Sequence, residues 1–218
     1  IFVLPGNVSS QYITGLLFAL PLLDGNSEIR ITTVLQSEDY VKITLDTLKA
    51  FSISVIYENN CFYIRGNQVY TVKNEPNVEG DWSNAAFFMT GAAIGQSEIT
   101  YKNLKDSSLQ GDKKVVDILQ NMGCQVERQE DTYYVSGKPL KATSIDAKPI
   151  PDLVPILALA AAVAEGETVI YNAERLRIKE SDRLKTLTTS IDSYSRLREK
   201  ERSGQALTLE EQEQKRVL

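Results

Sequence analysis

The chain reads RLRIKESDRLK at residues 175–185, between an apolar strand-like run, residues 168–171, and a helix-like run, residues 184–191. Five of these eleven residues are basic, and acidic side chains are interspersed among them. A strand that leads into a helix in this way is typical of α/β folds, in which helices connect successive strands. The stretch therefore predicts an α/β unit with a charged corner at the start of its second helix.

That helix start is a candidate anion site. The unpaired N–H groups and the positive dipole end of a helix N-terminus favour an anion before any side chain is counted. Lys179 and Arg183 lie four residues apart, so they converge if Ser181 or Asp182 caps the helix. The residues alone fit a capped surface helix with solvated charges equally well, and both interpretations stay open here.

The pattern around this corner recurs at intervals of about 70 residues. In each copy an apolar helix comes first, a strand and a second helix follow, and two copies then have a hairpin closed by glycine. The landmarks are Asn7, Asp81 and Asp152 for the first helix, Asp39, Asp112 and Asp182 for the second, and Gly66 and Gly137 for the hairpin ends. Strands that alternate with helices need crossovers, so we predict an α/β fold of repeated βαβαββ subdomains.

The third copy is expected to begin at Pro151 and to break off after Ile191. Residues 67–79 are polar and contain Pro76, which predicts a hinge between two domains. Because the chain opens on the strand-like run of residues 1–4 without an initiator Met, we expect it to be a fragment.

Residues 192–218 carry dense charge without apolar alternation, so we expect a tail that is helical or disordered. Ser203 and Gly204 predict a break in this tail. Thr208, followed three residues later by Glu211, predicts a capping box for a short second helix.

Composition excludes several classes of function. The net charge of −5 argues against a nucleic-acid partner, whose phosphates need a basic surface. The chain has no histidine, so Ser/His and Cys/His nucleophilic sites are excluded and proton transfer falls to carboxylates or lysines. Cys61 and Cys124 support neither a disulfide framework nor a zinc tetrad, which favours a cytoplasmic protein without a metal. The longest apolar run, residues 153–164, is too short to span a membrane.

Three motifs, LPGNVSSQ at residues 4–11, VEGD at 78–81 and RIKESDR at 177–183, together resemble the 5-enolpyruvylshikimate-3-phosphate (EPSP) synthase family. The resemblance covers residues 1 to about 191. It implies the enolpyruvyl-transferase fold, an inside-out α/β barrel of two domains with three subdomains each and an active site between them. It also implies that about half of the family's length is absent from this chain.

On this resemblance, residues 1–79 correspond to one repeat of the N-terminal domain, which binds shikimate 3-phosphate. Residues 80–191 correspond to one repeat and a truncated second repeat of the C-terminal domain. Residues 192–218 are unlike the family.

The resemblance assigns the shikimate 3-phosphate contacts of the first repeat to five residues. Ser9, Ser10 and Gln11 hold the phosphate, with Gln11 also near phosphoenolpyruvate. Ser37 makes a second phosphate contact and Tyr40 contacts the ring. From the residues alone, Ser9 and Ser10 fit a helix cap equally well, Ser37 fits a cap and Tyr40 fits a packing residue.

In the third repeat the resemblance assigns the catalytic residues. Asp152 bonds the shikimate hydroxyl as a base, although it also fits an N-cap for the helix of residues 153–164. Lys179 contacts the substrate near the reacting hydroxyl, Glu180 is the acid–base residue, and Arg183 binds phosphoenolpyruvate. Asp182 is expected only to cap the helix, and Arg175 stands where some members have a substrate-binding Asn.

The implied activity is enolpyruvyl transfer from phosphoenolpyruvate to the 5-hydroxyl of shikimate 3-phosphate, with no cofactor or metal. We expect the full-length enzyme to be a monomer and this fragment to be inactive alone and able to self-associate. The alternatives are a relative that transfers enolpyruvate to a UDP-sugar and a non-catalytic truncated remnant.

Overall fold

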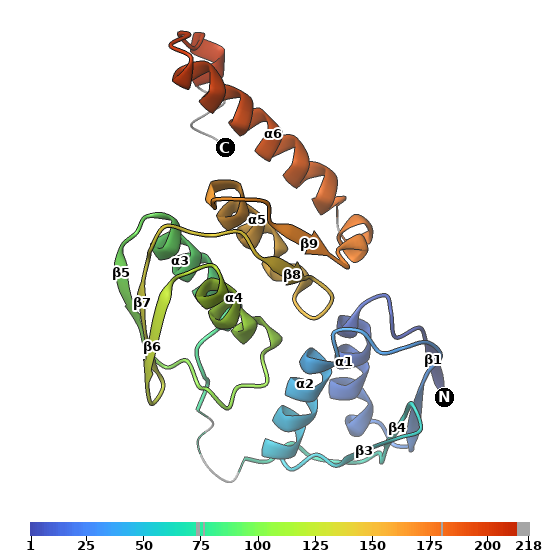
Figure 1. The fold of residues 1–218 in the computed structure, drawn as a ribbon. Helices are drawn as coiled ribbons and strands as arrows, with labels where there is room; N and C mark the ends of the chain where they lie inside the picture. Colours follow the sequence, from blue (N-terminus) through green and yellow to red (C-terminus); the bar gives the residue numbers. More distant parts are fainter. Residues whose placement is uncertain (73–74, 76, 180, 213–218) are drawn as a thin grey trace. The chain divides into compact units, whose positions relative to one another are not determined.

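A computed structural model describes residues 1–72, 75, 77–179 and 181–212 (Figure 1). The chain divides into two compact units. Unit 1 comprises Ile1–Trp82, Lys102–Lys113 and Glu130–Thr132, and unit 2 comprises Ser83–Tyr101, Lys114–Gln129 and Tyr133–Leu218. The assignment of residues 1–79 and 80–191 to two domains of a larger enzyme stays a prediction. The hinge predicted at residues 67–79 includes Pro76, which lies outside the described residues.

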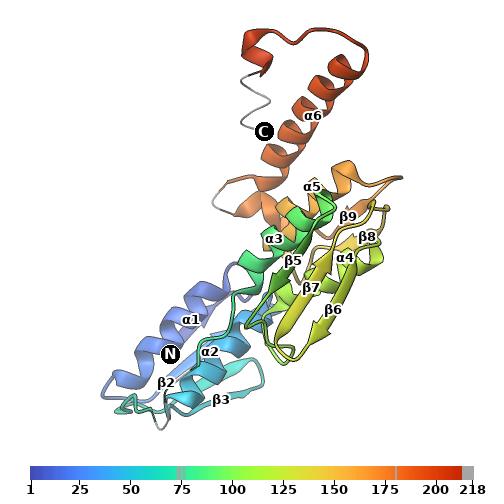
Figure 2. The same ribbon diagram turned by 90° about the vertical axis from the view of Figure 1, so that its left-hand side faces the viewer.

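Unit 1 contains one complete βαβαββ repeat. Its sheet has the order β1-β2-β4-β3, with β1 parallel to β2 and the other pairs antiparallel. The helices α1 and α2 lie side by side on one face of this sheet (Figure 2). The elements are β1 (Phe2–Leu4), α1 (Ser10–Ala19), η1 (Leu20–Leu22), β2 (Ser27–Ile31), α2 (Glu38–Ala50), β3 (Val55–Glu58) and β4 (Cys61–Ile64).

The helices cover the sheet because both present an apolar stripe to it. Ile13 and Leu17 of α1, Val41 and Leu48 of α2 and Phe62 of β4 are nearly fully buried in one core. These spacings of four and seven residues place the apolar side chains on one face of each helix. The two helices and the sheet of the first repeat therefore share one core.

The hairpin of the first repeat turns at Asn59 and Asn60, and its backbone explains the residue choice. Both residues have positive φ, 51° and 59°. Positive φ at both central residues defines a type I′ turn, which matches the twist of the flanking strands and which asparagine tolerates well.

A second repeat follows, with its sheet in the order β5-β7-β6. The predicted helix from Asp112 to Met122 begins as a 3₁₀ turn, η2, and becomes α-helical only at Val115. Among the described residues no strand lies between β4 and α3; instead, Gly80 N, just before α3, donates to Asn103 O at 2.7 Å. The elements are α3 (Trp82–Ile94), β5 (Glu98–Tyr101), η2 (Gly111–Lys114), α4 (Val115–Asn121), β6 (Gln125–Gln129) and β7 (Thr132–Ser136).

The third repeat begins earlier than predicted. Its first strand, β8 (Ser144–Asp146), pairs in parallel with β9 (Val169–Tyr171), so a start at Pro151 was wrong. A three-residue strand with a single apolar residue, Ile145, leaves too short a pattern to detect. Between and after these strands lie η3 (Pro151–Leu153), α5 (Val154–Val163), η4 (Glu174–Ile178) and α6 (Arg183–Arg202). Within residues 1–212, leaving out those not described, no helix is both long and apolar enough to cross a membrane.

Of the tail predicted to be helical or disordered, residues 192–202 are helical, and residues 213–218 lie outside the described residues. The helix α6 continues to Arg202, and the chain turns at Ser203 and Gly204, where Gly204 has φ +75°. The capping box is present: Glu211 N donates to Thr208 Oγ1 at 3.2 Å and Thr208 N donates to Glu211 Oε2 at 3.0 Å.

Candidate functional site

In unit 2, three of the predicted site residues meet at the charged corner. Arg183 Nη1 donates to Asp152 Oδ1 at 2.8 Å, and Lys179 Nζ lies 3.5 Å from the same oxygen. Each of the three side chains is between a quarter and a third exposed. A half-buried ion pair of this kind still faces solvent, so a ligand can reach it.

The local fold explains why Asp152 faces the two cations. Asp152 lies in η3, and the N-cap position of α5 is Leu153, which has no side-chain cap bond. The alternative of Asp152 as a helix cap is therefore wrong. Lys179 follows the end of η4 in an extended conformation, and Arg183 is the first residue of α6. Lys179, just after η4, and Arg183, at the start of α6, thus both reach Asp152 in η3.

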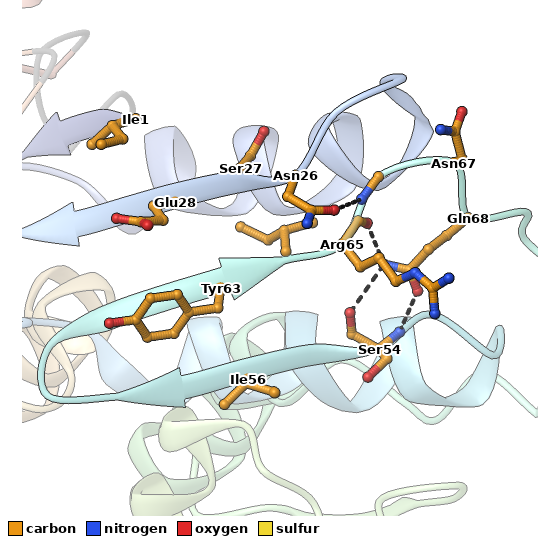
Figure 3. A pocket seen from close by; sticks show the side chains of 12 residues that line it. Ile1, Asn26, Ser27, Glu28, Ser54, Ile56, Tyr63, Arg65, Asn67 and Gln68 are labelled. Carbon is orange, nitrogen blue, oxygen red and sulfur yellow. Dashed lines mark hydrogen bonds between the residues drawn. The ribbon is translucent and has the colours of Figure 1, made fainter.

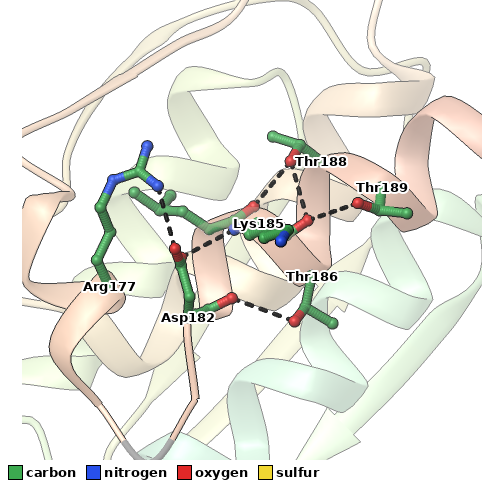
Figure 4. Close-up of polar contacts among 7 residues, drawn as sticks. Arg177, Asp182, Lys185, Thr186, Thr188 and Thr189 are labelled. Atoms are coloured by element: carbon green, nitrogen blue, oxygen red, sulfur yellow. Dashed lines mark hydrogen bonds and ion pairs between the residues drawn. The ribbon is translucent and has the colours of Figure 1, made fainter.

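Asp182 fixes the start of α6, as predicted (Figure 4). Its Oδ1 accepts the backbone N–H of Lys185 at 3.0 Å, and its Oδ2 pairs with Arg177 at 3.2 Å. These two donors, the Lys185 N–H first and the Arg177 guanidinium after it, lower the pKa of the Asp182 carboxyl. The cap orients the helix end from which Arg183 projects.

The two oxygens of Asp152 differ in their surroundings. Both cationic contacts fall on Oδ1, and among the described residues none donates a hydrogen bond to Oδ2. A carboxylate held through one oxygen keeps the lone pairs of the other for a ligand hydroxyl. Such an arrangement can orient a hydroxyl group and accept its proton.

Arg175 adds a buried positive charge to this corner. Its residue is only 8% exposed, and the neighbouring Leu176 packs in a core with Ala147 and Val154. Burial lowers the pKa of the Arg175 guanidinium, and the negative charges of Asp152 and Glu174 oppose that shift. The three cations Arg175, Lys179 and Arg183 near Asp152 suit an anionic ligand, although Glu174 adds a second negative charge beside Arg175. The predicted acid–base residue, Glu180, lies outside the described residues.

In unit 1, the predicted phosphate loop forms the start of α1. Ser9 is its N-cap, and Ser9 Oγ accepts the backbone N–H of Gln11 at 3.3 Å, so the capping alternative is confirmed for this residue. Ser10 is the first helical residue. A cap does not exclude a ligand, because the other N–H groups of the first turn still point outward.

The starts of α1 and α2 lie side by side. Thr14 Oγ1 and Thr44 Oγ1 are 2.9 Å apart, which joins the two helices near their midpoints. The loops that precede them also meet: Gln36 N donates to Gly6 O at 2.9 Å. A Cβ on Gly6 would lie 2.7 Å from Ile31 Cγ2, so this approach requires glycine. Two helix N-termini therefore converge beyond the carboxyl ends of the parallel strands, where α/β folds bind ligands.

Ser37 and Tyr40 lie at the start of α2. Ser37 occupies the predicted N-cap position of α2, with φ +55°, but its hydroxyl makes no cap bond to the helix. Tyr40 Oη donates to Asp112 Oδ2 at 2.9 Å, and Asp112 is 4% exposed. Sequence reasoning placed Asp112 only at a helix start. No local pattern signals its contact with Tyr40, 72 residues away.

A separate hollow of about 710 Å³ lies on the outer face of the unit 1 sheet (Figure 3). Its polar groups are used internally: the Gln68 amide bonds both Ser54 N and Ser54 O, and Asn26 Oδ1 accepts Gly66 N. None of the predicted site residues lines it. This hollow therefore lies at the end of the β3–β4 hairpin opposite the turn at Asn59 and Asn60, apart from the predicted site.

Comparisons with known proteins agree with the motifs. Residues 2–197 match the family model of EPSP synthase (3-phosphoshikimate 1-carboxyvinyltransferase). The chain is 48% identical over 193 residues to the 3-phosphoshikimate 1-carboxyvinyltransferase of Clostridium beijerinckii, covering 88% of this chain and 44% of that protein. It is 48% identical over 199 residues to the enzyme of that name from Brachyspira hyodysenteriae, covering 90% and 46%.

A solved structure agrees as well. EPSP synthase from Acinetobacter baumannii superimposes with a TM-score of 0.67 at 29% identity, over 87% of this chain and 44% of that one. The chain thus spans somewhat less than half the length of the relatives it matches.

Proposed function

This chain belongs to the EPSP synthase family, and on that premise we propose that it forms one part of an active site for enolpyruvyl transfer. The substrates are phosphoenolpyruvate and shikimate 3-phosphate. The segments that the chain lacks relative to its relatives supply the rest of the site.

In the proposed reaction the 5-hydroxyl oxygen of shikimate 3-phosphate bonds to the central carbon of phosphoenolpyruvate, whose methylene carbon takes up a proton. The tetrahedral adduct then loses phosphate, and the new methyl group gives up a proton as the double bond re-forms. Both substrates are highly anionic. Fixed cations and positioned carboxylates therefore provide most of the catalysis.

The single observation that carries this proposal is the environment of Asp152. Lys179 and Arg183 hold one of its oxygens, and the other accepts no hydrogen bond from the described residues. A carboxylate that two cations hold through one oxygen can accept the hydroxyl proton of shikimate 3-phosphate at the other. The planar Arg183 guanidinium suits the carboxylate or phosphate of phosphoenolpyruvate, and Glu180 serves as the acid–base partner.

In unit 1, Ser9, Ser10 and Gln11 bind the phosphate of shikimate 3-phosphate, with Ser37 as a second contact and Tyr40 against the ring. The convergent starts of α1 and α2 support this assignment, because two helix N-termini add their dipoles and N–H groups to the hydroxyl donors. Gln11 lies close to the phosphoenolpyruvate position.

Two alternatives predict different results. A transferase for UDP-sugars would use the same architecture but would show no response to shikimate 3-phosphate. A non-catalytic remnant would keep the fold and lose the chemistry even when the absent segments are supplied.

A graft tests the proposal. Residues 2–197 replace the matching segment of the C. beijerinckii enzyme, and phosphate release is measured with both substrates. We expect turnover within about tenfold of the parent enzyme and a loss of about 10²–10⁴ in kcat for the Asp152→Asn graft. A graft that folds but releases no phosphate would contradict the proposed function and would favour the remnant.

A further inference from the structure

The segment Lys102–Lys113 leaves the repeat to which it belongs by sequence. The strand β5 before it and the helix α4 after it belong to unit 2, whereas the segment itself is part of unit 1. Asn103 O accepts Gly80 N at 2.7 Å, and Asn103 Nδ2 donates to Val78 O at 3.2 Å. The segment is therefore attached to the chain just before α3.

Gln110 completes this attachment. Its Oε1 accepts Trp82 N at 2.8 Å, and its Nε2 donates to Glu79 Oε1 and to Gly80 O, each at 2.9 Å. Ser108 Oγ donates to the same Glu79 oxygen at 2.8 Å. With so many bonds to one short stretch of backbone, the end of the segment has a fixed position.

Asp112 stands at that fixed end and reaches α2. It is 4% exposed, one of the few charged residues buried in the described chain, and its Oδ2 accepts the Tyr40 hydroxyl at 2.9 Å. A hydrogen bond to a buried carboxylate is charge-assisted and short, so it restricts the Tyr40 side chain strongly. Tyr40 lies in the first turn of α2, beside the helix starts that converge in unit 1.

We propose that Asp112 is a positioning residue that holds the Tyr40 ring ready for the carbocyclic ring of shikimate 3-phosphate. The inference rests on the proposed function, since it takes Tyr40 as the ring contact. Asp112 itself does not touch the substrate; it acts through the tyrosine hydroxyl. A ring that is already fixed loses less conformational entropy when the ligand binds, and this gain appears as affinity.

Four versions of the 218-residue chain test the inference by calorimetric titration with shikimate 3-phosphate. They are the unchanged chain, Tyr40→Phe, Asp112→Asn and the double variant. We expect each single variant to raise the dissociation constant about three- to tenfold. The double variant should bind no more weakly than the single ones, because Asp112 acts only through Tyr40. If Asp112 only stabilised the fold, adding Asp112→Asn to Tyr40→Phe would lower the affinity further.

Asp106→Asn is the matched control, because Asp106 lies on the same segment, is more than half exposed and pairs with Lys113. It should leave the affinity unchanged. If Asp112→Asn fails to fold, Tyr40→Phe still decides, since unchanged affinity after loss of the hydroxyl overturns the inference.

The outcomes separate the two proposals. If the unchanged chain binds and Asp112→Asn binds equally well, the positioning role is overturned while the proposed function stands. If the unchanged chain gives no heat at millimolar shikimate 3-phosphate, the proposed binding site fails and the positioning role falls with it.

Discussion

Asp152 illustrates how a single residue gains its role from partners that are distant in sequence. Its helix-capping alternative rested on its position before an apolar run, and the structure instead turns its side chain toward Lys179 and Arg183. Contacts across 27 and 31 residues leave no periodic signal, so the residue pattern alone could not decide between cap and site. The motif resemblance could, because it assigned these three residues together.

The pH dependence of stability tests whether the charge of the Asp182 cap stabilises the fold. Its folded-state pKa is lowered, so the charge stabilises the fold above the unfolded pKa of about 3.9, and this contribution is lost as pH falls through the folded pKa. Asn keeps the capping oxygen but not the charge. Thermal unfolding should show Asp182→Asn less stable than the unchanged chain at pH 7, with the difference shrinking below about pH 3.9. A difference independent of pH would contradict the assignment.

Glu180 and Arg183 should separate kinetically in the grafted enzyme. Glu180→Gln removes only a titrating group, so kcat should fall by about 10²–10⁴ with little change in KM. Arg183→Ala should raise the KM for phosphoenolpyruvate roughly ten- to a hundredfold. Because Arg183 also donates a hydrogen bond to Asp152, the kcat of the Arg183→Ala variant should fall as well. Steady-state kinetics with both substrates measure this, and Asp182→Asn is the control; a Glu180→Gln graft as active as that control would refute the acid–base role.

At the scale of elements, the repeats were predictable because the residues that end helices and strands recur along the chain. The asparagine turn, the glycines at the hairpin ends and the tail capping box all act through local backbone geometry, which sequence displays directly. β8 was missed because three residues carry no measurable period. The late α-helical start at Val115 was missed because Asp112 turns inward to Tyr40, a tertiary contact.

Substitution of Gly66 tests whether the glycines at the hairpin ends are needed for stability. A Cβ there would collide with the carbonyl oxygens of Leu23 and Gly25, whereas a Cβ on Gly25 meets nothing within 4 Å. Gly66→Ala should therefore lower the free energy of unfolding by about 1–3 kcal/mol, and Gly25→Ala should change it by less than about 0.5 kcal/mol. Urea unfolding measures both, and Gly137→Ala should repeat the Gly66 result because its Cβ would meet Ala92 O. Equal effects of Gly66→Ala and Gly25→Ala would contradict this view of the hairpin ends.

At the scale of the whole molecule, the chain carries proposed substrate-binding residues in both units. It spans less than half the length of its relatives. We therefore expect the 218-residue chain alone to release no phosphate from the two substrates above background, although the graft does. Robust turnover by the purified chain would show that the absent segments are dispensable.

Calorimetric titration with shikimate 3-phosphate tests most directly whether the charged corner binds an anion or is only a capped helix start. Lys179→Ala and the control Lys185→Ala each remove one positive charge from the same corner, but Lys185 is exposed and only its backbone is used by the cap. We predict that Lys179→Ala weakens binding roughly ten- to a hundredfold and that Lys185→Ala weakens it less than about threefold. Equal affinities of the two variants would contradict the claim and leave the corner a capped surface helix.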